Sequence, residues 1–185
     1  MYLHTLASGS TGNCLLFSHN GQHLLLDAGI SCRRITTALQ ALDMEPQSLL
    51  GVCVTHEHTD HISGLATLTK QYGLPVLTSP GTGRQLCYRI AAMEDLLSPL
   101  SPGGVTDLGP FHIAAFPTSH DAAQPMGFTV SAEGRTAAVV TDLGYVSDDV
   151  LDGILGADLV VCESNHDVEW LQAGPYPYFL KSRIL

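Results

Sequence analysis

The sequence predicts a layered α/β protein made of one domain. Short apolar runs bounded by glycine, asparagine, aspartate and serine alternate with segments of helical periodicity, the pattern of sheets covered by helices. The chain has 185 residues, of which 45% are hydrophobic and 14% charged, as in a compact globular domain. Because no linker, low-complexity tract or internal repeat divides the sequence, we expect a single domain over residues 1–185.

The predicted strands are short apolar runs that end at turn-forming residues. Asn20-Gly21 is typical of a two-residue hairpin and joins the second strand to the third. The expected strands are 2–7, 13–18, 22–27, 49–54 and 75–78 in the first half, and 111–116, 126–132, 135–140 and 158–162 in the second.

Three helices are predicted between these strands. The first covers 31–42, where leucine and isoleucine recur at helical spacing. The second covers 63–72 and ends at Gly73, a residue favoured just past a helix C-terminus. A short third helix is expected near 148–155.

The charge balance weighs on the choice of partner. Eight Lys and Arg against eighteen Asp and Glu give a formal net charge of −10, and the basic residues form no tract. Nucleic-acid-binding proteins normally carry a basic face, because counterion release drives much of their affinity. Charge therefore counts mildly against a nucleic-acid substrate, although bound cations would cancel part of the deficit.

The cysteines and the N-terminus indicate the compartment. The five cysteines are odd in number and include no CxxC pair, which fits a reducing compartment better than a disulfide framework. Residues 1–7 lack the basic start and long apolar core of a signal peptide. No run of about 18 uncharged apolar residues exists. We expect a cytoplasmic protein with no membrane contact and no obligate protein partner.

A cluster of histidines follows the predicted strand 49–54 directly. On a helix, His56 and His58 would point about 200° apart. On a loop leaving a strand, alternate residues share a side, while Asp60 and His61 can turn toward an adjacent point. Three imidazoles and a carboxylate suit zinc, or manganese in a more oxygen-rich shell. The alternative is a polar loop with accidental histidines.

Two more candidate ligands follow later strands. His120 comes after the predicted strand 111–116, and Asp142 after 135–140. Taken alone, such a histidine is usually structural and such an aspartate is often a turn former. Beside the first cluster, both become candidates. The expected sites place His56, His58 and His120 on one metal, Asp60 and His61 on the other, and Asp142 between them.

The order His-x-His-x-Asp-His, then His, then Asp is similar to the pattern of the metallo-β-lactamase superfamily. The flanking segments Leu6–Cys14, Leu26–Gly29, Thr141–Ser147 and Glu163–Asp167 resemble bacterial YycJ/WalJ-type hydrolases over almost the whole chain. The resemblance implies an αββα sandwich with the metals at one edge, and two divalent ions, with zinc the first choice and manganese the alternative. It also implies nuclease activity, of the double-stranded DNA exonuclease type.

Further residues gain roles from this resemblance. Asp27 is expected to orient a ligand imidazole, and otherwise to form a turn. Ser10 and Asn13 lie in a loop of small residues that could offer N–H groups to a phosphate, or form a plain tight turn. Glu163 and His166 are expected to line the cleft, although helix capping explains part of their segment.

The chain ends at Leu185, before two His-Leu-Ser motifs that the resembling proteins carry. We therefore expect the domain to be incomplete at the C-terminus, with the last part of the second sheet missing and a weakened second metal site.

The expected function is hydrolysis of phosphodiesters through a metal-bridging hydroxide, with Asp60 as both ligand and catalytic proton acceptor. The alternatives are a superfamily hydrolase of a lactam, a thioester or a small cyclic phosphodiester, and a non-catalytic metal-binding module.

Overall fold

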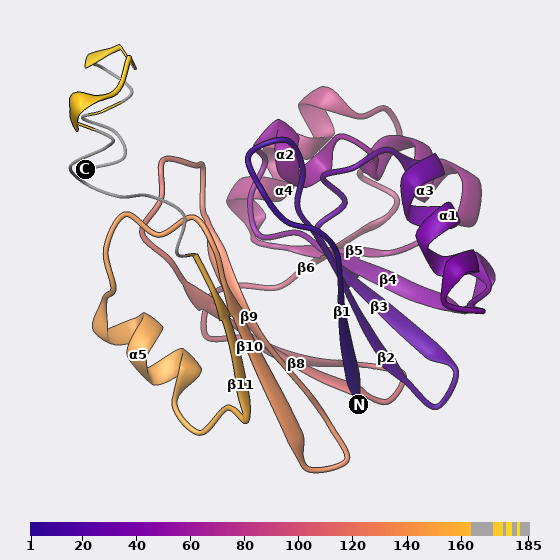
Figure 1. Cartoon of the computed structure of the whole chain (residues 1–185). Helices are drawn as coiled ribbons and strands as arrows, with labels where there is room; N and C mark the ends of the chain where they lie inside the picture. The colour runs from indigo at the N-terminus through magenta and orange to yellow at the C-terminus, as the bar shows by residue number, and fades with distance from the viewer. Residues whose placement is uncertain (164–171, 176, 179–180, 182–185) are drawn as a thin grey trace.

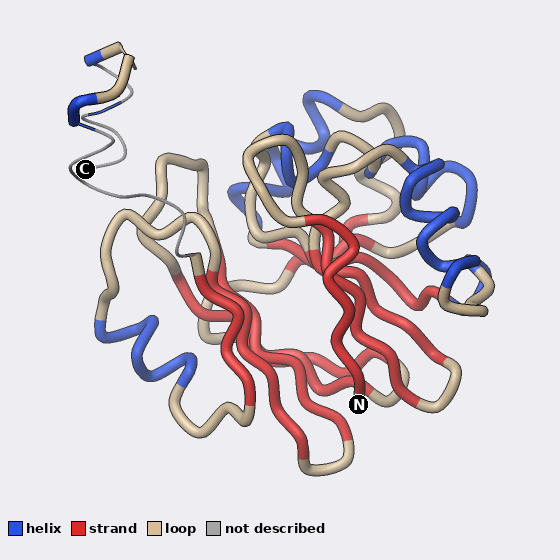
Figure 2. The backbone as a smooth tube through the Cα atoms, in the orientation of Figure 1, coloured by secondary structure: helices blue, strands red, loops and turns tan. Residues whose placement is uncertain are grey.

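Two β-sheets packed face to face form the centre of the molecule, with helices on both outer sides. The computed structural model describes residues 1–163, 172–175, 177–178 and 181. Helices α1 to α4 cover the outer face of the first sheet, and α5 lies against the outer face of the second (Figures 1 and 2). This is the αββα sandwich that the sequence predicted, so the predicted fold class is confirmed.

The first sheet holds six strands in the order β1-β2-β3-β4-β5-β6. The pairs β1/β2 and β2/β3 are antiparallel, and the remaining pairs are parallel. Asn20 and Gly21 form the β2–β3 turn with φ of 49° and 74°, as a type I′ hairpin requires. The strands are β1 Tyr2–Ala7, β2 Cys14–His19, β3 Gln22–Leu26, β4 Leu49–Cys53, β5 Val76–Thr78 and β6 Leu97–Pro99.

The second sheet holds five strands in the order β11-β10-β9-β8-β7 among the described residues. All its neighbours are antiparallel except β10 and β11. The strands are β7 Val105–Leu108, β8 Phe111–Pro117, β9 Met126–Ala132, β10 Arg135–Val140 and β11 Leu159–Cys162. The expectation that the last part of this sheet is missing stays a prediction.

The helices are short, and three of them start at a serine cap. Ser31, Ser79 and Ser147 each accept a hydrogen bond from the backbone N–H three residues on, which satisfies a donor that the first helical turn leaves free. The helices are α1 Cys32–Ala41, the 3₁₀ turn Pro46–Ser48, α2 Thr59–Ile62, α3 Leu65–Tyr72, α4 Pro80–Arg89 and α5 Asp148–Ile154. None of the described helices is long and apolar enough to cross a membrane.

Strand β2 shows how the layers arise from the sequence. All six of its residues are buried, because the strand is covered on both faces. Cys14 and Leu16 point into the core beneath the helices, whereas Leu15 and Phe17 point into the core between the sheets. Alternate residues of one apolar run thus fill two different cores.

Two differences from the predicted elements concern the candidate site. Residues 59–62, expected to belong to a loop, form the one-turn helix α2. Helix α4 was not predicted, because it opens with Pro80-Gly81-Thr82-Gly83, residues of poor intrinsic helix propensity. Strands β6 and β7 and the 3₁₀ turn were also not predicted.

Candidate metal centre

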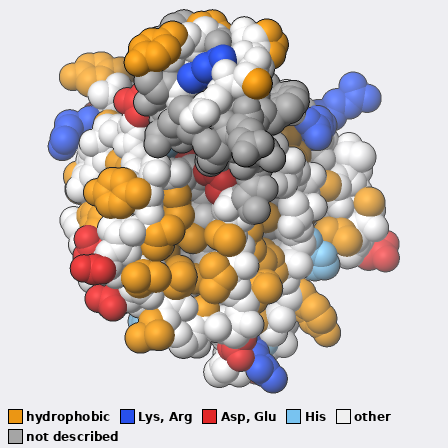
Figure 3. All heavy atoms as spheres, turned by 60° about the vertical axis from the view of Figure 1, so that its left-hand side comes forward, with side chains coloured by type: hydrophobic (Ala, Val, Ile, Leu, Met, Phe, Trp, Pro, Cys, Tyr) orange, Lys and Arg blue, Asp and Glu red, His pale blue; other side chains and the backbone are white. Residues whose placement is uncertain are grey.

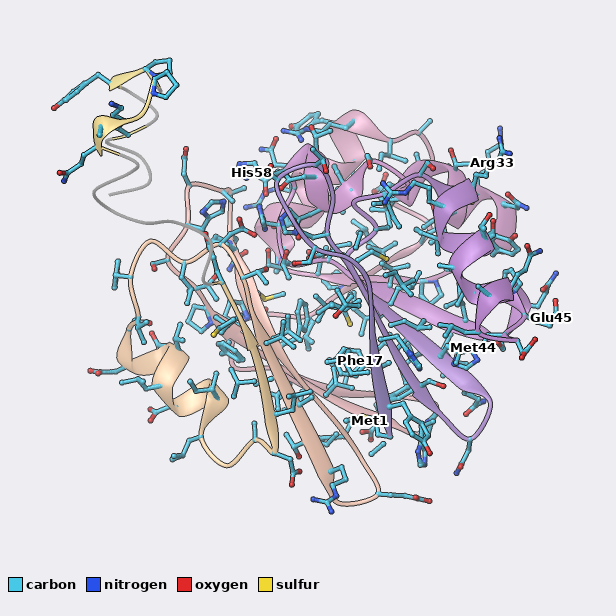
Figure 4. The ribbon with its side chains drawn as sticks, viewed as in Figure 1. Met1, Phe17, Arg33, Met44, Glu45 and His58 are labelled. Carbon is cyan, nitrogen blue, oxygen red and sulfur yellow. The ribbon has the colours of Figure 1, made fainter. Side chains whose placement is uncertain are left out.

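The candidate residues gather at one end of the sandwich, where strands of both sheets run into loops. His56 and His58 follow β4, and Asp27 follows β3. From the second sheet, His120 lies between β8 and β9, and Asp142 follows β10. Figure 4 shows His58 at this end of the first half of the molecule, facing the loops of the second sheet. Residues far apart in sequence therefore meet at the sheet edge.

Three imidazoles converge in the first group of candidate ligands. His58 Nδ1 lies 3.1 Å from His56 Nε2 and 3.1 Å from His120 Nε2. Nitrogens bound to one tetrahedral zinc ion, each at about 2.0–2.1 Å, are themselves about 3.3 Å apart. His56 is buried, and the other two are partly exposed. The spacing fits one metal ion reached from solvent.

A second group shares His56 with the first. Its members are His56, His61 and Asp142, whose ligand atoms lie within 4.8 Å of one another. Asp142 Oδ2 is 2.9 Å from His61 Nε2, and Asp60 Oδ2 is 3.5 Å from the same nitrogen. The structure brings together all six expected ligands, with Asp60 at the margin of the second group.

Asp27 holds His61 from behind. Its Oδ2 lies 2.8 Å from His61 Nδ1, and both side chains are almost completely buried. The Thr55 backbone N–H and hydroxyl also donate to Asp27, at 2.9 to 3.1 Å. With Nδ1 turned to a carboxylate, Nε2 faces the candidate metal position, as in carboxylate–histidine–metal triads.

In the metal-free cluster, the pKa values of His56 and His61 shift in opposite directions. Burial, and then the charge of His61, lower the pKa of His56 to about 3. Burial opposes charge on His61 as well, but Asp27 and hydrogen bonds with Asp142 and Asp60 outweigh it and raise the pKa of His61 to about 12. Hydrogen bonding with His61 lowers the pKa of Asp60. Burial would raise the pKa of Asp142, but the interactions with His61 hold it at about 2. A protonated His61 thus offsets the negative charge of the carboxylates, at the position where a metal cation would bind.

Two of the acidic residues adopt left-handed backbone conformations. Asp27 has φ of 60° and Asp142 has φ of 55°, a region that non-glycine residues enter rarely and that aspartate tolerates better than most. Each follows a strand and turns the chain sharply there. Such backbone strain concentrates at functional sites.

The loop between β1 and β2 contacts the cluster through the side chain of Asn13. The Asn13 side-chain nitrogen lies 3.4 Å from Asp60 Oδ2 and 3.2 Å from His61 Nε2, and its oxygen accepts the Gly9 N–H at 3.0 Å. Ser10 lies at the exposed tip of this loop. Asn13 is therefore at the cluster, and Ser10 is on the rim.

Glu163 supports the segment that carries Asp142. Its Oε2 accepts the backbone N–H of Leu143 at 3.1 Å, next to the candidate ligand. His166, the other residue expected here, lies outside the described residues.

Thr55 and Glu57 were not among the predicted site residues. The Thr55 hydroxyl lies 3.0 Å from His56 Nδ1 and 3.3 Å from His61 Nδ1. Glu57 is buried next to two ligands. The signal in the sequence was their position, since each directly adjoins a candidate ligand in the His-x-His-x-Asp-His motif.

Comparison with known proteins agrees with this geometry. A family model described as a beta-lactamase superfamily domain matches residues 22–175, most of the chain. The chain belongs to this superfamily. Within the superfamily, it is 40% identical to Exodeoxyribonuclease YycJ of Bacillus anthracis, covering 100% of this chain and 70% of the relative. It is 34% identical to Exodeoxyribonuclease WalJ of Streptococcus pneumoniae serotype 2 (strain D39 / NCTC 7466), covering 97% of this chain and 68% of that protein.

A solved structure supports the fold of the superfamily. The Rm3 metallo-beta-lactamase aligns with a TM-score of 0.67 at 18% identity, over 86% of this chain and 74% of that one. The histidine cluster lies at the sheet edge of this fold, and the superfamily fold implies binding of divalent metal ions. The buried imidazoles and carboxylates present here are a suitable donor set for such ions.

Proposed function

We propose that this chain is a metal-dependent nuclease that hydrolyses phosphodiester bonds of DNA, acting from the ends of double strands. Its membership of the superfamily makes it a hydrolase. The observation that carries the proposal is the pair of ligand groups sharing His56 in a chain 40% identical to an exodeoxyribonuclease. Two adjacent cations suit the attacking and leaving oxygens of a phosphodiester displacement.

The proposed ligands are the six residues predicted from the sequence. His56, His58 and His120 would hold one ion, and His61, Asp142 and Asp60 would hold the other, with His56 common to both candidate groups. When bound, the ions would supply Lewis acidity, which lowers the pKa of water and neutralises phosphate charge. Zinc is the first choice because imidazole nitrogen predominates, and manganese is the alternative.

The surrounding residues would orient the ligands and handle protons. Asp27 would keep His61 Nε2 free to bind an ion by accepting a hydrogen bond from Nδ1. Asp60, which is partly exposed, is proposed to accept a proton from the attacking water. The Asn13 amide, beside Asp60 Oδ2, would contact a phosphate oxygen, with Ser10 on the rim of the same loop.

A second candidate substrate is a small phosphodiester. The net charge of −10 favours it, because a long polyanion is repelled at a distance more strongly than a compact one.

A panel of substrates tests both candidates. End-labelled double-stranded DNA, single-stranded DNA, RNA and bis(p-nitrophenyl) phosphate would be incubated with protein loaded with zinc or manganese. We expect progressive shortening of double-stranded DNA and slower turnover of the others, with His58→Ala as the inactive control. Turnover of the small diester alone would favour the second candidate. Hydrolysis of a thioester with no action on any phosphodiester would overturn both.

A further inference from the structure

Glu57 lies between the first two histidines of the motif and points away from them. Alternate residues of an extended segment face opposite sides, so the two histidines that face the cluster leave Glu57 directed into the protein. Its side chain is only 7% exposed. A buried carboxylate is costly unless it is hydrogen-bonded, so its partners are informative.

Those partners belong to the His120 loop and to helix α4. Glu57 Oε1 accepts the backbone N–H of Ala123 at 2.8 Å. Glu57 Oε2 accepts the hydroxyl of Thr82 at 3.4 Å, and the backbone carbonyl of Glu57 accepts from Arg89 Nη1 at 2.6 Å. Thr82 and Arg89 are two turns apart on α4 and therefore share a face. One helix face thus holds both the backbone and the side chain of Glu57.

The same helix start also receives the His120 loop. The Gln124 carbonyl accepts the Ser79 hydroxyl at 2.6 Å, and Gln124 Oε1 accepts the Gly81 N–H at 2.8 Å. A Cβ at Gly81 would lie 2.5 Å from Gln124 Cβ, so the loop approaches as closely as glycine allows. These contacts join a loop of the second sheet to a helix packed on the first.

We propose that Glu57 is a positioning residue that sets the metal affinity of the three-histidine group. His56 and His58 follow a strand of the first sheet and His120 follows a strand of the second, so their 3.1 Å approaches depend on how the two halves are joined. The hydrogen bond from Ala123 to Glu57 connects the two halves three residues after His120. The inference rests on the proposed function only in requiring that these histidines bind a divalent transition-metal ion.

The test compares three substitutions that separate reach from charge. Glu57→Asp keeps the charge but withdraws the carboxylate by one methylene, Glu57→Gln keeps the length and an acceptor oxygen for Ala123, and Glu57→Ala removes both. The control is Glu133→Gln, because Glu133 is 72% exposed and lies in the β9–β10 turn. Zinc affinity would be measured by competition with a chromophoric chelator.

Loss of an outer partner of a metal ligand typically weakens metal affinity by about 10–100-fold. We expect that loss in Glu57→Ala and Glu57→Asp, a change of no more than about threefold in Glu57→Gln, and none in the control. Amide hydrogen exchange of residues 118–126 in metal-free protein should accelerate in the alanine and aspartate variants alone. Should Glu57→Ala fail to fold in a thermal melt, the aspartate variant carries the comparison.

The outcomes distinguish the two proposals. Wild-type protein that binds no zinc overturns the proposed function and this inference together. Wild-type binding that the aspartate variant matches, with unchanged exchange at 118–126, overturns the inference alone and makes Glu57 merely structural. Equal weakening in the glutamine and aspartate variants also overturns it, because a side chain of the original length would then fail to restore the affinity.

Discussion

His58 is the residue on which the first ligand group converges. Its Nδ1 faces both His56 and His120, and the side chain is partly exposed, so its removal should leave the core intact. This combination separates metal binding from folding more cleanly than His61, which is fully buried and bonded to Asp27.

We therefore predict that His58→Ala lowers zinc content to about half of the wild-type value or less after dialysis, with an unchanged circular dichroism spectrum. The reason is the loss of one of only three imidazoles around that ion. Elemental analysis measures the zinc content. The control is His112→Ala, since His112 is exposed and pairs with Asp107. Wild-type zinc content in His58→Ala would remove it from the ligand set.

His61 gives the metal-free protein a pH dependence of stability whose sign can be stated. Its pKa is raised from 6.5 to about 12, so the folded state holds a proton that the unfolded state releases above about pH 6.5. The stabilisation is fully present below pH 6.5 and is lost as pH rises toward 12. We predict that the free energy of unfolding in chelator falls by at least about 1 kcal/mol between pH 7 and pH 9.

Urea denaturation at three pH values measures this slope. The matched variant is Asp27→Asn, which keeps the shape but removes the first of the charges that favour protonated His61. Its slope should be flatter than that of the wild type. An equally steep slope in both proteins would contradict the assignment of the titrating group to His61.

At the scale of elements, the bounds of helices and strands were predicted best where a single spacing of apolar residues dominated the segment. Strand β2 and helix α1 appear within about one residue of their expected bounds, because their apolar spacing has a single interpretation. Helix α4 could not be predicted, because its N-terminal half is Pro80-Gly81-Thr82-Gly83. It forms because Ser79 caps it and because Gln124 docks against it, and tertiary contacts of this kind leave no local pattern.

The same contrast between local sequence pattern and tertiary contact applies to the candidate site. The six candidate ligands, which the structure brings close together, could be named from the sequence because residue type and spacing indicate metal chemistry. The role of Glu57 could not be predicted, because it depends on Ala123, 66 positions away. Helix α2 was likewise missed, since its four residues are too few for a helical period to appear.

Gly29 is the tightest approach of backbone at the site. A Cβ there would lie 1.6 Å from the Asp60 carbonyl oxygen. The preceding residue, Ala28, donates a backbone hydrogen bond to His61 and accepts one from Gly64. We predict that Gly29→Ala destabilises the protein by about 3 kcal/mol, since overpacking forces the backbone apart, and that it weakens metal binding by displacing Asp60. Chemical denaturation and zinc titration measure the two effects.

The control separates steric conflict from loss of glycine's freedom. Gly134 has φ of 70°, and an added Cβ there would meet no atom within 4 Å, so Gly134→Ala carries only the conformational cost, about 1 kcal/mol. A cost for Gly29→Ala no larger than that for Gly134→Ala would mean that the contact with Asp60 relaxes freely.

At the scale of the whole molecule, several basic side chains lie apart from the site or are already bonded, as Arg89 is to the Glu57 backbone carbonyl. Figure 4 places Arg33, on α1, on the opposite side of the first half from His58. Arg135 is paired with Asp158 at 2.8 Å. The face formed by α5 and β11 carries exposed apolar side chains, among them Leu155 and Leu159 (Figure 3). None of these features supplies a basic track leading to the cluster.

A DNA substrate would therefore be held mainly at the metal ions, with few phosphates neutralised by lysine or arginine. The logarithm of affinity falls with the logarithm of salt concentration at about −0.9 per phosphate neutralised. With about two such contacts, we predict that raising NaCl from about 50 to about 200 mM lowers kcat/KM on double-stranded DNA by roughly tenfold to twentyfold. A protein making 6–10 phosphate contacts would lose affinity by about 10³–10⁵-fold over the same change.

Turnover of bis(p-nitrophenyl) phosphate, which spans no neighbouring phosphates, is the control and should change less than about threefold. A loss on DNA of about 10³-fold or more, with the small diester unaffected, would show that an extended basic surface binds the substrate after all.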